Sequence, residues 1–226
     1  MLARLRSFDL SYSQAQATPN EFATPCSQQE EIQNMNTKEL LAALDDLDYQ
    51  GVWLFNSAML MSMFPNETTK TLLSSLNRHV KSGLLKKVKK GLYANDRAQC
   101  APLKRLEALV PYLRPRAINY ISQESRLAEL GVISQMPIDH MTFMTTGRTQ
   151  TFKTCYGTLE FTHTDRQPKS ILAETFVDSE SGHLIATAER ALRDLRRAGR
   201  NTKLVDMTIY QEITSTPNGS MEEQNG

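Results

Sequence analysis

The sequence predicts an α+β protein whose first part is rich in helices and whose second part is built on a small, mostly antiparallel sheet. Three observations predict this class. Apolar residues recur at helical spacing through the first part, and two short extended runs follow its third helix. Runs rich in Thr, Phe and Tyr, with partial alternation, occupy the later part of the chain. The 226 residues are enough for one large or two small domains.

The chain divides by composition into four predicted segments: a disordered or weakly ordered arm at 1–35, folded domains at 36–95 and 96–213, and a disordered tail at 214–226. The arm is rich in Gln, Ser, Thr, Asn and Glu. No apolar run approaches the roughly 18 residues of a membrane span, and the three cysteines are scattered. We therefore expect a cytoplasmic protein without a membrane partner.

The first two helices follow from capping residues and apolar spacing. Leucines recur at helical spacing after a capping Asn36 or Thr37, which predicts a helix that ends at Gly51. A short extended run at 52–55 comes next. An apolar helix at 58–64 then ends at a proline, which cannot continue it.

A third helix and a hairpin complete the first part. The helix is predicted at 67–82, with Gly83 as its stop and an inward stripe formed by Leu72, Leu73, Leu76 and Val80. Two extended runs at 84–88 and 91–94 then flank a basic turn. Helix, strand, helix, turn, helix and hairpin is the element order of a winged helix-turn-helix. In that module the helix after the turn lies in the major groove of DNA.

Positive charge is concentrated in this same segment. The whole chain carries a net charge of +1, yet residues 67–95 hold seven basic side chains and one acidic one. A solvated charge run is the ordinary interpretation, but the position beside a polar helix face favours binding of double-stranded DNA. Hydroxyls and Arg suit base edges, and lysines suit phosphates. The predicted DNA-contacting residues are Lys70, Thr71, Ser74, Ser75, Arg78, Lys81, Lys86, Lys87, Lys89 and Lys90.

The second part is predicted as helices around a sheet. Helices are expected at 102–113, 122–130 and 187–198, and extended runs at 117–121, 140–145, 149–154, 158–164 and 171–177. Five arginines lie on or just after the last helix: Arg190, Arg193, Arg196, Arg197 and Arg200. They form either a self-paired, solvated face or a second basic surface for nucleic acid or a partner.

The sequence predicts neither catalysis nor a cofactor. Walker A, GxGxxG, HExxH and GxSxG motifs are all absent, and no two histidines or cysteines have metal-ligand spacing. One acidic group near a strand, made of Glu174, Asp178 and Glu180, is interpreted as a solvated loop. A cation site or part of a nuclease site is the alternative.

Five segments of the chain together resemble the AbiEi family: "LLKKVKKGLYA" (84–94), "YISQESRLAELGVI" (120–133), "DHMTFMTTGRTQTF" (139–152), "GTLEFTH" (157–163) and "ATAERALRDL" (186–195). Members are antitoxins of type IV toxin–antitoxin and abortive-infection modules, and the resemblance covers about residues 37–200. The best-matching positions are Tyr120, Ile121, Ser122, Ser125, Leu127, Gly131, Glu189, Arg190, Ala191, Leu192 and Asp194. Arg126 and Ala188 depart from the family pattern.

The resemblance implies a winged-helix repressor of its own operon in a bacterium. Such a protein would bind inverted repeats in its promoter and oppose a nucleotidyltransferase-like toxin without forming a stable complex with it. We expect a monomer that pairs on DNA. A ligand-responsive winged-helix regulator is the first alternative, and a polar pocket in the second part would favour it. A DNA-targeted nuclease is the second, and acidic residues converging beside a lysine would favour that.

Overall fold

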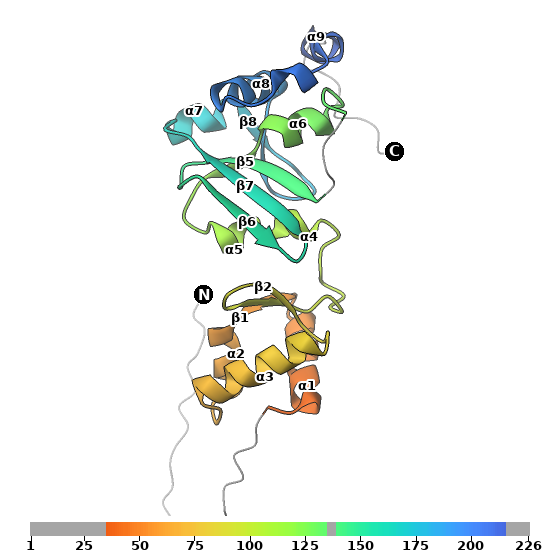
Figure 1. Cartoon of the computed structure of the whole chain (residues 1–226), viewed down its shortest axis with the longest axis vertical. Helices are drawn as coiled ribbons and strands as arrows, with labels where there is room; N and C mark the ends of the chain where they lie inside the picture. The colour runs from red at the N-terminus through yellow and green to blue at the C-terminus, as the bar shows by residue number, and fades with distance from the viewer. Residues whose placement is uncertain (1–34, 135–138, 216–226) are drawn as a thin grey trace, which may run out of the picture. The chain divides into compact units, whose positions relative to one another are not determined.

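The computed structural model describes residues 35–134 and 139–215. All described residues belong to one unit defined by internal contacts. Its helices and two sheets confirm the predicted α+β class (Figure 1). The predicted arm and tail lie outside the described residues, apart from Met35, Thr214 and Ser215. None of the described helices has the length and apolar character needed to cross a membrane.

The first six elements enclose a small core. They are α1 (Thr37–Tyr49), β1 (Leu54–Asn56), α2 (Ser57–Met63), α3 (Thr69–Lys81), β2 (Lys86–Lys89) and β3 (Leu92–Ala94). The three strands form an antiparallel sheet in the order β1-β3-β2, with Tyr93 opposite both Phe55 and Lys87. Leucines of all three helices pack with Phe55 and Tyr93 beneath it.

Polar caps begin each of these helices, as their sequences predict. Asn36 and Glu39 form a reciprocal capping box at the start of α1. Asn56 and Thr68 accept hydrogen bonds from the first-turn backbone of α2 and α3. After α3, Gly83 takes a φ of +77°, a conformation that glycine adopts without strain. The chain therefore reverses there into β2.

The later elements alternate between short helices and strands. They are α4 (Arg105–Ala108), α5 (Val110–Leu113), β4 (Asn119–Ile121), α6 (Gln123–Glu129), β5 (His140–Thr145), β6 (Gln150–Thr154), β7 (Gly157–His163), α7 (Pro168–Leu172), β8 (Thr175–Val177), β9 (Leu184–Ala186), α8 (Ala188–Arg197), a 3₁₀ turn (Thr202–Leu204) and α9 (Met207–Ser215). The strands form one six-stranded sheet in the order β6-β7-β5-β4-β9-β8.

The sequence predicted a mostly antiparallel sheet, and this sheet is mixed, with three antiparallel strand pairs and two parallel ones. β5 pairs with β7, and β4 with β9, in parallel, whereas the other three pairs are antiparallel. The parallel pairing of β5 with β7 follows from the strand order. After β5 the chain skips one position to form the edge strand β6, and β7 then returns between the two, which aligns it with β5.

Two predicted elements differ for local reasons that involve proline. The helix expected at 102–113 is divided into α4 and α5, because Pro111 has no backbone N–H to donate to the carbonyl one turn earlier. The strand expected at 171–177 begins only at Thr175. Pro168 stands at the first position of α7, where its fixed φ favours a helix.

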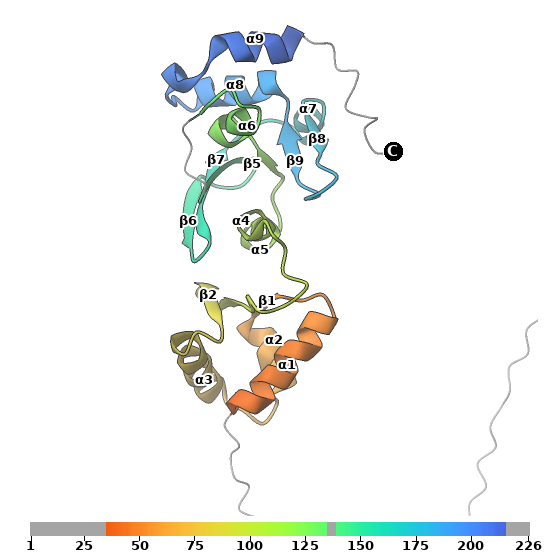
Figure 2. The same cartoon turned by 90° about the vertical axis from the view of Figure 1, so that its right-hand side faces the viewer.

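Helices cover both faces of the six-stranded sheet (Figure 2). Tyr120 and Met144 lie in a core with α6 and α8, while their strand neighbours Ile121 and Phe143 lie in the core that includes α4 and α5. The second of these cores also contains Trp53, Val88 and Leu92 of the first part. It therefore runs across the domain boundary that was predicted near residue 95, a boundary that stays a prediction.

Candidate nucleic-acid interface

The outward side of α3 carries a polar and basic stripe. The exposed residues of α3 are Thr69, Lys70, Leu73, Ser74, Asn77, Arg78 and Lys81. Leu73, which the sequence predicted to face inward, is 37% exposed on this same side. Asn77 was not predicted, although its position three residues after Ser74 places it on the same face. The opposite side is buried and consists of Leu72, Ser75, Leu76 and His79.

Two residues of α3 depart from the surface that the sequence predicted. Ser75 is only 5% exposed, because it lies three residues after Leu72 and therefore faces the core. Thr71 is half-buried, and its hydroxyl forms a hydrogen bond with that of Thr68. Its backbone N–H donates to the same Thr68 oxygen. Thr71 is thus part of the helix cap.

Arg78 has a structural contact as well as an exposed position. Its Nη2 donates to the backbone carbonyl of Met35 over 3.1 Å. Met35 is fully buried, and its N–H is hydrogen-bonded to Glu67. These two contacts hold Met35, which lies two residues before α1, against α3 and against the loop that precedes it.

The four lysines of the β2–β3 hairpin divide into two pairs. Lys86 forms an ion pair with Asp96 and lies 5.3 Å from the ring centre of Tyr156, while Lys89 lies 6.0 Å from that of Phe152. Phe152 and Tyr156 belong to β6 and the turn that follows it. All four are exposed, and Lys87 and Lys90 are the two for which neither an ion pair nor a ring contact is seen among the described residues.

Asp96 links the β2–β3 hairpin to the β6–β7 turn, because it contacts residues of both. It accepts a hydrogen bond from the Tyr156 hydroxyl, pairs with Lys86 and lies 3.7 Å from Arg105. Burial alone would raise the pKa of Asp96, but the hydrogen bonds from Lys86 and Tyr156 and the nearby charges outweigh burial. Its pKa therefore lies below the usual range, and the carboxylate neutralises one of the four lysines.

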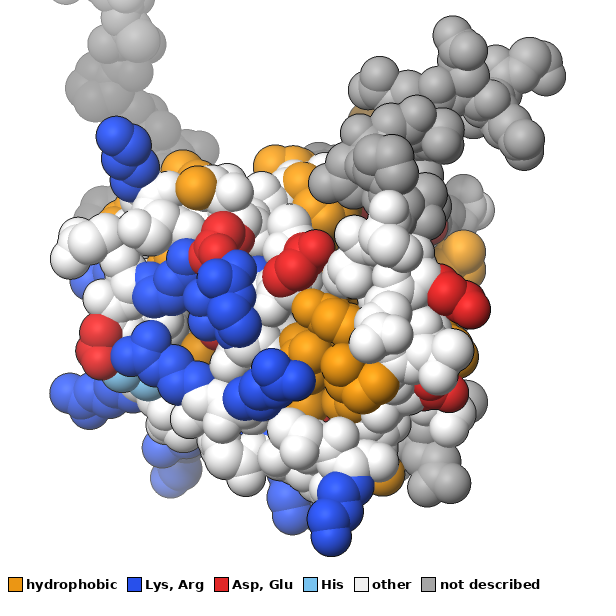
Figure 3. Space-filling view, turned by 90° about the horizontal axis from the view of Figure 1, so that it is seen from above, with side chains coloured by type: hydrophobic (Ala, Val, Ile, Leu, Met, Phe, Trp, Pro, Cys, Tyr) orange, Lys and Arg blue, Asp and Glu red, His pale blue; other side chains and the backbone are white. Residues whose placement is uncertain are grey.

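The arginines of α8 do not form one basic surface. Arg190 is 7% exposed, and its Nε donates to Asp194 over 2.9 Å, because it lies on the same buried side of the helix as Leu195. Arg193 pairs with Glu174, and Arg200 with Glu160. Arg196 and Arg197 are exposed. On the face of the molecule that carries α8, basic and acidic side chains stand together (Figure 3).

Two of the segments that resemble the AbiEi family meet at Asp194. Its Oδ2 accepts from the Tyr120 hydroxyl at 3.1 Å and from the Ser122 hydroxyl at 2.8 Å. Burial, followed by the charge of Asp194, raises the pKa of Tyr120 to about 12. These side chains are all buried, so the matching positions build a polar network between β4 and α8.

Of the acidic group that the sequence predicted, Glu174 lies apart, whereas the charges of Asp178 and Glu180 both act on Glu107 and Lys104. Glu174 is enclosed by three arginines: Arg166, Arg190 and Arg193. Asp178 accepts hydrogen bonds from Ser181. Within residues 35–134 and 139–215, no three His, Cys, Asp or Glu side chains are grouped so that they could hold a metal ion.

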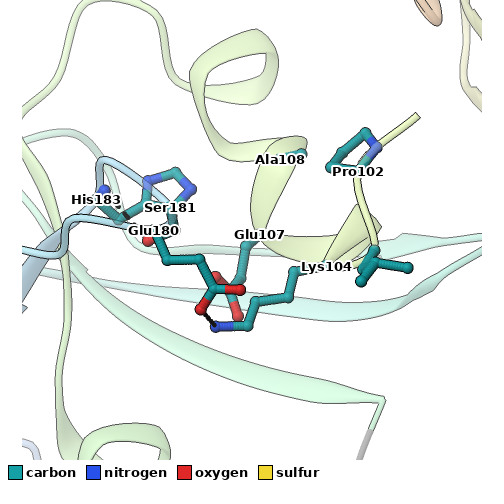
Figure 4. Close-up of a pocket in the computed structure, with 8 residues that line it drawn as sticks. Pro102, Lys104, Glu107, Ala108, Glu180, Ser181 and His183 are labelled. Atoms are coloured by element: carbon teal, nitrogen blue, oxygen red, sulfur yellow. Dashed lines mark hydrogen bonds and ion pairs between the residues drawn. The ribbon is translucent and has the colours of Figure 1, made fainter. Parts of the chain in front are cut away.

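Glu180 lines a cavity of about 220 Å³ beside α4 (Figure 4). It pairs with Lys104 over 3.1 Å, and Glu107 and His183 line the same cavity. Burial raises the pKa of Glu107 and lowers that of His183, so both shifts favour the neutral form. A second cavity of about 140 Å³ lies beside α8, and His163, Asp165 and Arg197 are among the residues that line it.

Comparison with known proteins adds no relative. No protein-family model matches the chain, and a search of curated proteins finds no match. The relation to the AbiEi family therefore rests on the five sequence segments alone and stays a prediction.

Proposed function

We propose that residues 37–94 form a winged helix-turn-helix that binds double-stranded DNA, with α3 in the major groove and the β2–β3 hairpin as the wing. The observation that carries this proposal is the exposed stripe of α3. It combines short hydrogen-bonding side chains with basic ones and is followed directly by two free lysines. The only carboxylate of the segment 67–95 is Glu67, which is hydrogen-bonded to Met35. The surface is therefore suited to a polyanion.

The residues of this surface fit two different tasks. Ser74 and Asn77 offer hydroxyl and amide groups that reach base edges, and Arg78 can do so if it leaves the Met35 carbonyl. Lys70 and Lys81 stand toward the two ends of α3, and Lys87 and Lys90 on the hairpin. Point charges at such flanking positions suit backbone phosphates, which set orientation rather than sequence preference.

The first test reverses the two free lysines. We expect Lys87→Glu with Lys90→Glu to abolish binding to the DNA upstream of the protein's own gene, measured by gel shift. The control is Lys169→Glu, which makes one such charge reversal at an exposed position of α7. Circular dichroism would show that all variants stay folded. Retained binding in the double variant would refute the wing.

The wider role follows from the family resemblance. The protein would repress its own operon by binding inverted repeats, and would oppose a nucleotidyltransferase-like toxin without a stable complex. We expect co-expression with the toxin encoded beside it to restore growth. The Lys87→Glu, Lys90→Glu variant should restore growth equally well if the second part carries the antitoxin role. Failure of the wild-type protein to restore growth would refute this role and leave DNA binding untouched.

A ligand-responsive regulator is the second candidate, and the cavity beside α4 favours it. The cavity combines an ion pair with two groups held toward neutrality, an arrangement that can recognise a small polar molecule. A metabolite that raises the melting temperature of the wild-type chain, but not of a Glu107→Gln variant, would support this alternative.

A further inference from the structure

Two cations share one aromatic ring where the hairpin meets the six-stranded sheet. Lys89 Nζ lies 6.0 Å from the ring centre of Phe152, and Arg114 Cζ lies 5.3 Å from the same centre. β2 and β6 are in contact here, and Figure 2 shows the end of β6 beside β2. The separation of the two charges cannot exceed the sum of these distances, which is close to the screening length of roughly 8–10 Å at physiological salt.

A third cation extends this row. Arg114 Nη2 donates to the backbone carbonyl of Arg148 over 2.7 Å and to Gln150 Oε1 over 3.1 Å. Burial, and then the charge of Arg148, lowers the pKa of Arg114, so the two guanidinium groups repel each other. We call Lys89, Arg114 and Arg148 the cationic strip.

No carboxylate balances the strip. Among residues 35–134 and 139–215, none of its three members forms an ion pair, whereas arginine or lysine pairs with Glu129, Glu160, Glu174, Glu180 and Asp194. The fold therefore holds Arg114 and Arg148 together at an electrostatic cost, with Lys89 beside the Phe152 ring that Arg114 also contacts. A bound polyanion would remove that cost.

We propose that the cationic strip binds the phosphate backbone of double-stranded DNA, beside the stretch contacted by α3 and the hairpin. The inference rests on the proposed function, because Lys89 joins the strip to the wing. Guanidinium groups suit phosphate oxygens, and duplex DNA presents one charge per roughly 1.7 Å of its axis. The strip thus lengthens the DNA surface from the first part of the chain onto edge strand β6.

Duplex DNA fits the strip better than a single strand does. Binding of single strands relies on aromatic rings that are open for bases to stack upon. Phe152 is half-buried and already has cations near its ring, and Phe161, which also lies 5.2 Å from Arg114, is fully buried. The strip therefore offers charge without a stacking platform.

The test compares two positions on or beside the same strand. Arg148→Gln removes a strip charge while keeping the backbone carbonyl that Arg114 binds. Lys153→Gln is the matched control, because Lys153 is exposed, directly follows Phe152 and therefore projects from the other face of the sheet. Binding to a duplex of roughly 30 base pairs, about three helical turns, would be measured by fluorescence anisotropy across a range of salt concentrations.

We expect Arg148→Gln to reduce the slope of log affinity against log salt by about 0.9, the value for one phosphate contact. Lys153→Gln should keep the wild-type slope, and Arg148→Lys should restore most of it because the charge remains. Melting temperatures would confirm that all variants are folded.

Three results would overturn the strip. In the first, Arg148→Gln keeps the wild-type slope of log affinity against log salt, but Lys87→Glu with Lys90→Glu loses binding. That result contradicts the strip and leaves the proposed function standing. The second is an equal reduction in Arg148→Gln and Lys153→Gln. In the third, Arg148→Gln weakens binding to a single-stranded RNA of the same length but does not weaken binding to the duplex. If the wild-type chain binds no duplex at all, the wild-type titration alone shows that both proposals fail.

Discussion

At the scale of single residues, His79 is an imidazole built into the core of α3. It is 2% exposed, and its Nε2 has no hydrogen-bond partner among the described residues. Burial, and then the charge of Arg78, lowers its pKa below 6.5. The neutral form is therefore the one that the fold accepts.

This burial predicts a loss of stability in mild acid. Below about pH 6.5 the unfolded chain takes up a proton at His79 before the folded chain does, so the free energy of unfolding falls as the pH drops. One such group contributes up to about 1.4 kcal/mol per pH unit. Urea unfolding from pH 7.5 to 5 would measure this dependence, and His79→Gln should flatten it.

Two other histidines also contribute to the pH dependence of stability, and their contributions must be distinguished from that of His79. His183 has a lowered pKa through burial and acts in the same direction. His163 acts in the opposite direction, because its ring nitrogens face Asp165 and the Gly147 carbonyl and its pKa is raised. It stabilises the fold below pH 6.5 and loses that contribution as the pH rises through its folded pKa. An unaltered pH profile in His79→Gln would contradict the assignment to His79.

The hydroxyl of Tyr156 makes a second prediction at this scale. Burial and its hydrogen bond to Asp96 raise the pKa of Tyr156, so it stays a donor at all ordinary pH values. Tyr156→Phe would leave Asp96 with one donor fewer, and hydrogen bonds to charged groups contribute roughly 1.5–3 kcal/mol. We expect a loss of about that size in chemical denaturation. Tyr112→Phe, at an exposed tyrosine, is the control and should change little.

At the scale of elements, α8 is anchored by charge inside the core. Arg190 and Asp194 are both buried and bind each other, and Asp194 also receives hydrogen bonds from Tyr120 and Ser122 on the β4 side. Removing one partner of a buried pair leaves the other charge uncompensated, which typically costs about 3–5 kcal/mol.

We therefore expect Asp194→Ala to be severely destabilising. The control is Arg193→Ala on the same helix, since the Arg193 side chain is 54% exposed and such pairs contribute about 0–1 kcal/mol. Replacing both buried partners, as in Arg190→Met with Asp194→Leu, should recover only the part of the loss that comes from the uncompensated Arg190 charge, because the Tyr120 and Ser122 hydroxyls still lose their acceptor. Equal melting temperatures for Asp194→Ala and Arg193→Ala would contradict this view of the helix.

Elements with local signals were predictable from the sequence, and those fixed by distant partners were not. The caps Asn36 and Thr187 lie directly before the helices whose starts they specify. The apolar residues that specify α3 lie within that helix. The order of the six strands depends on pairings between distant segments, such as Tyr120 with Leu184. The engagement of Lys86 and Lys89 by aromatic residues more than 60 positions later had no signal in the hairpin itself.

At the scale of the whole molecule, one hydrophobic core joins the first and second parts. Trp53 packs edge-on against Tyr156 with ring centres 6.0 Å apart, and Val88 and Leu92 lie in the same cluster as Phe143 and Phe161. Burial of shared apolar surface couples the unfolding of the parts that share it.

This shared core predicts a single cooperative unfolding transition. Trp53 is the only tryptophan, so its fluorescence reports on the junction, while circular dichroism reports on all helices. We expect both signals to change at the same denaturant concentration. A Trp53 transition that clearly precedes the loss of helical signal would instead show two independent domains divided near residue 95.

The contact of Lys86 and Lys89 with Tyr156 and Phe152 has a consequence for how the sequence can diverge. A substitution at Phe152 or Tyr156 changes the setting of the hairpin without altering any residue of α3. Positions 86, 89, 152 and 156 should therefore behave as one epistatic group. In a pairwise mutational scan for repression, a loss at Tyr156 should be compensated by changes at Lys86 or Asp96 more often than by changes on α3. If the hairpin binds DNA as proposed, drift in the sheet would change the affinity for DNA while α3 stays unchanged.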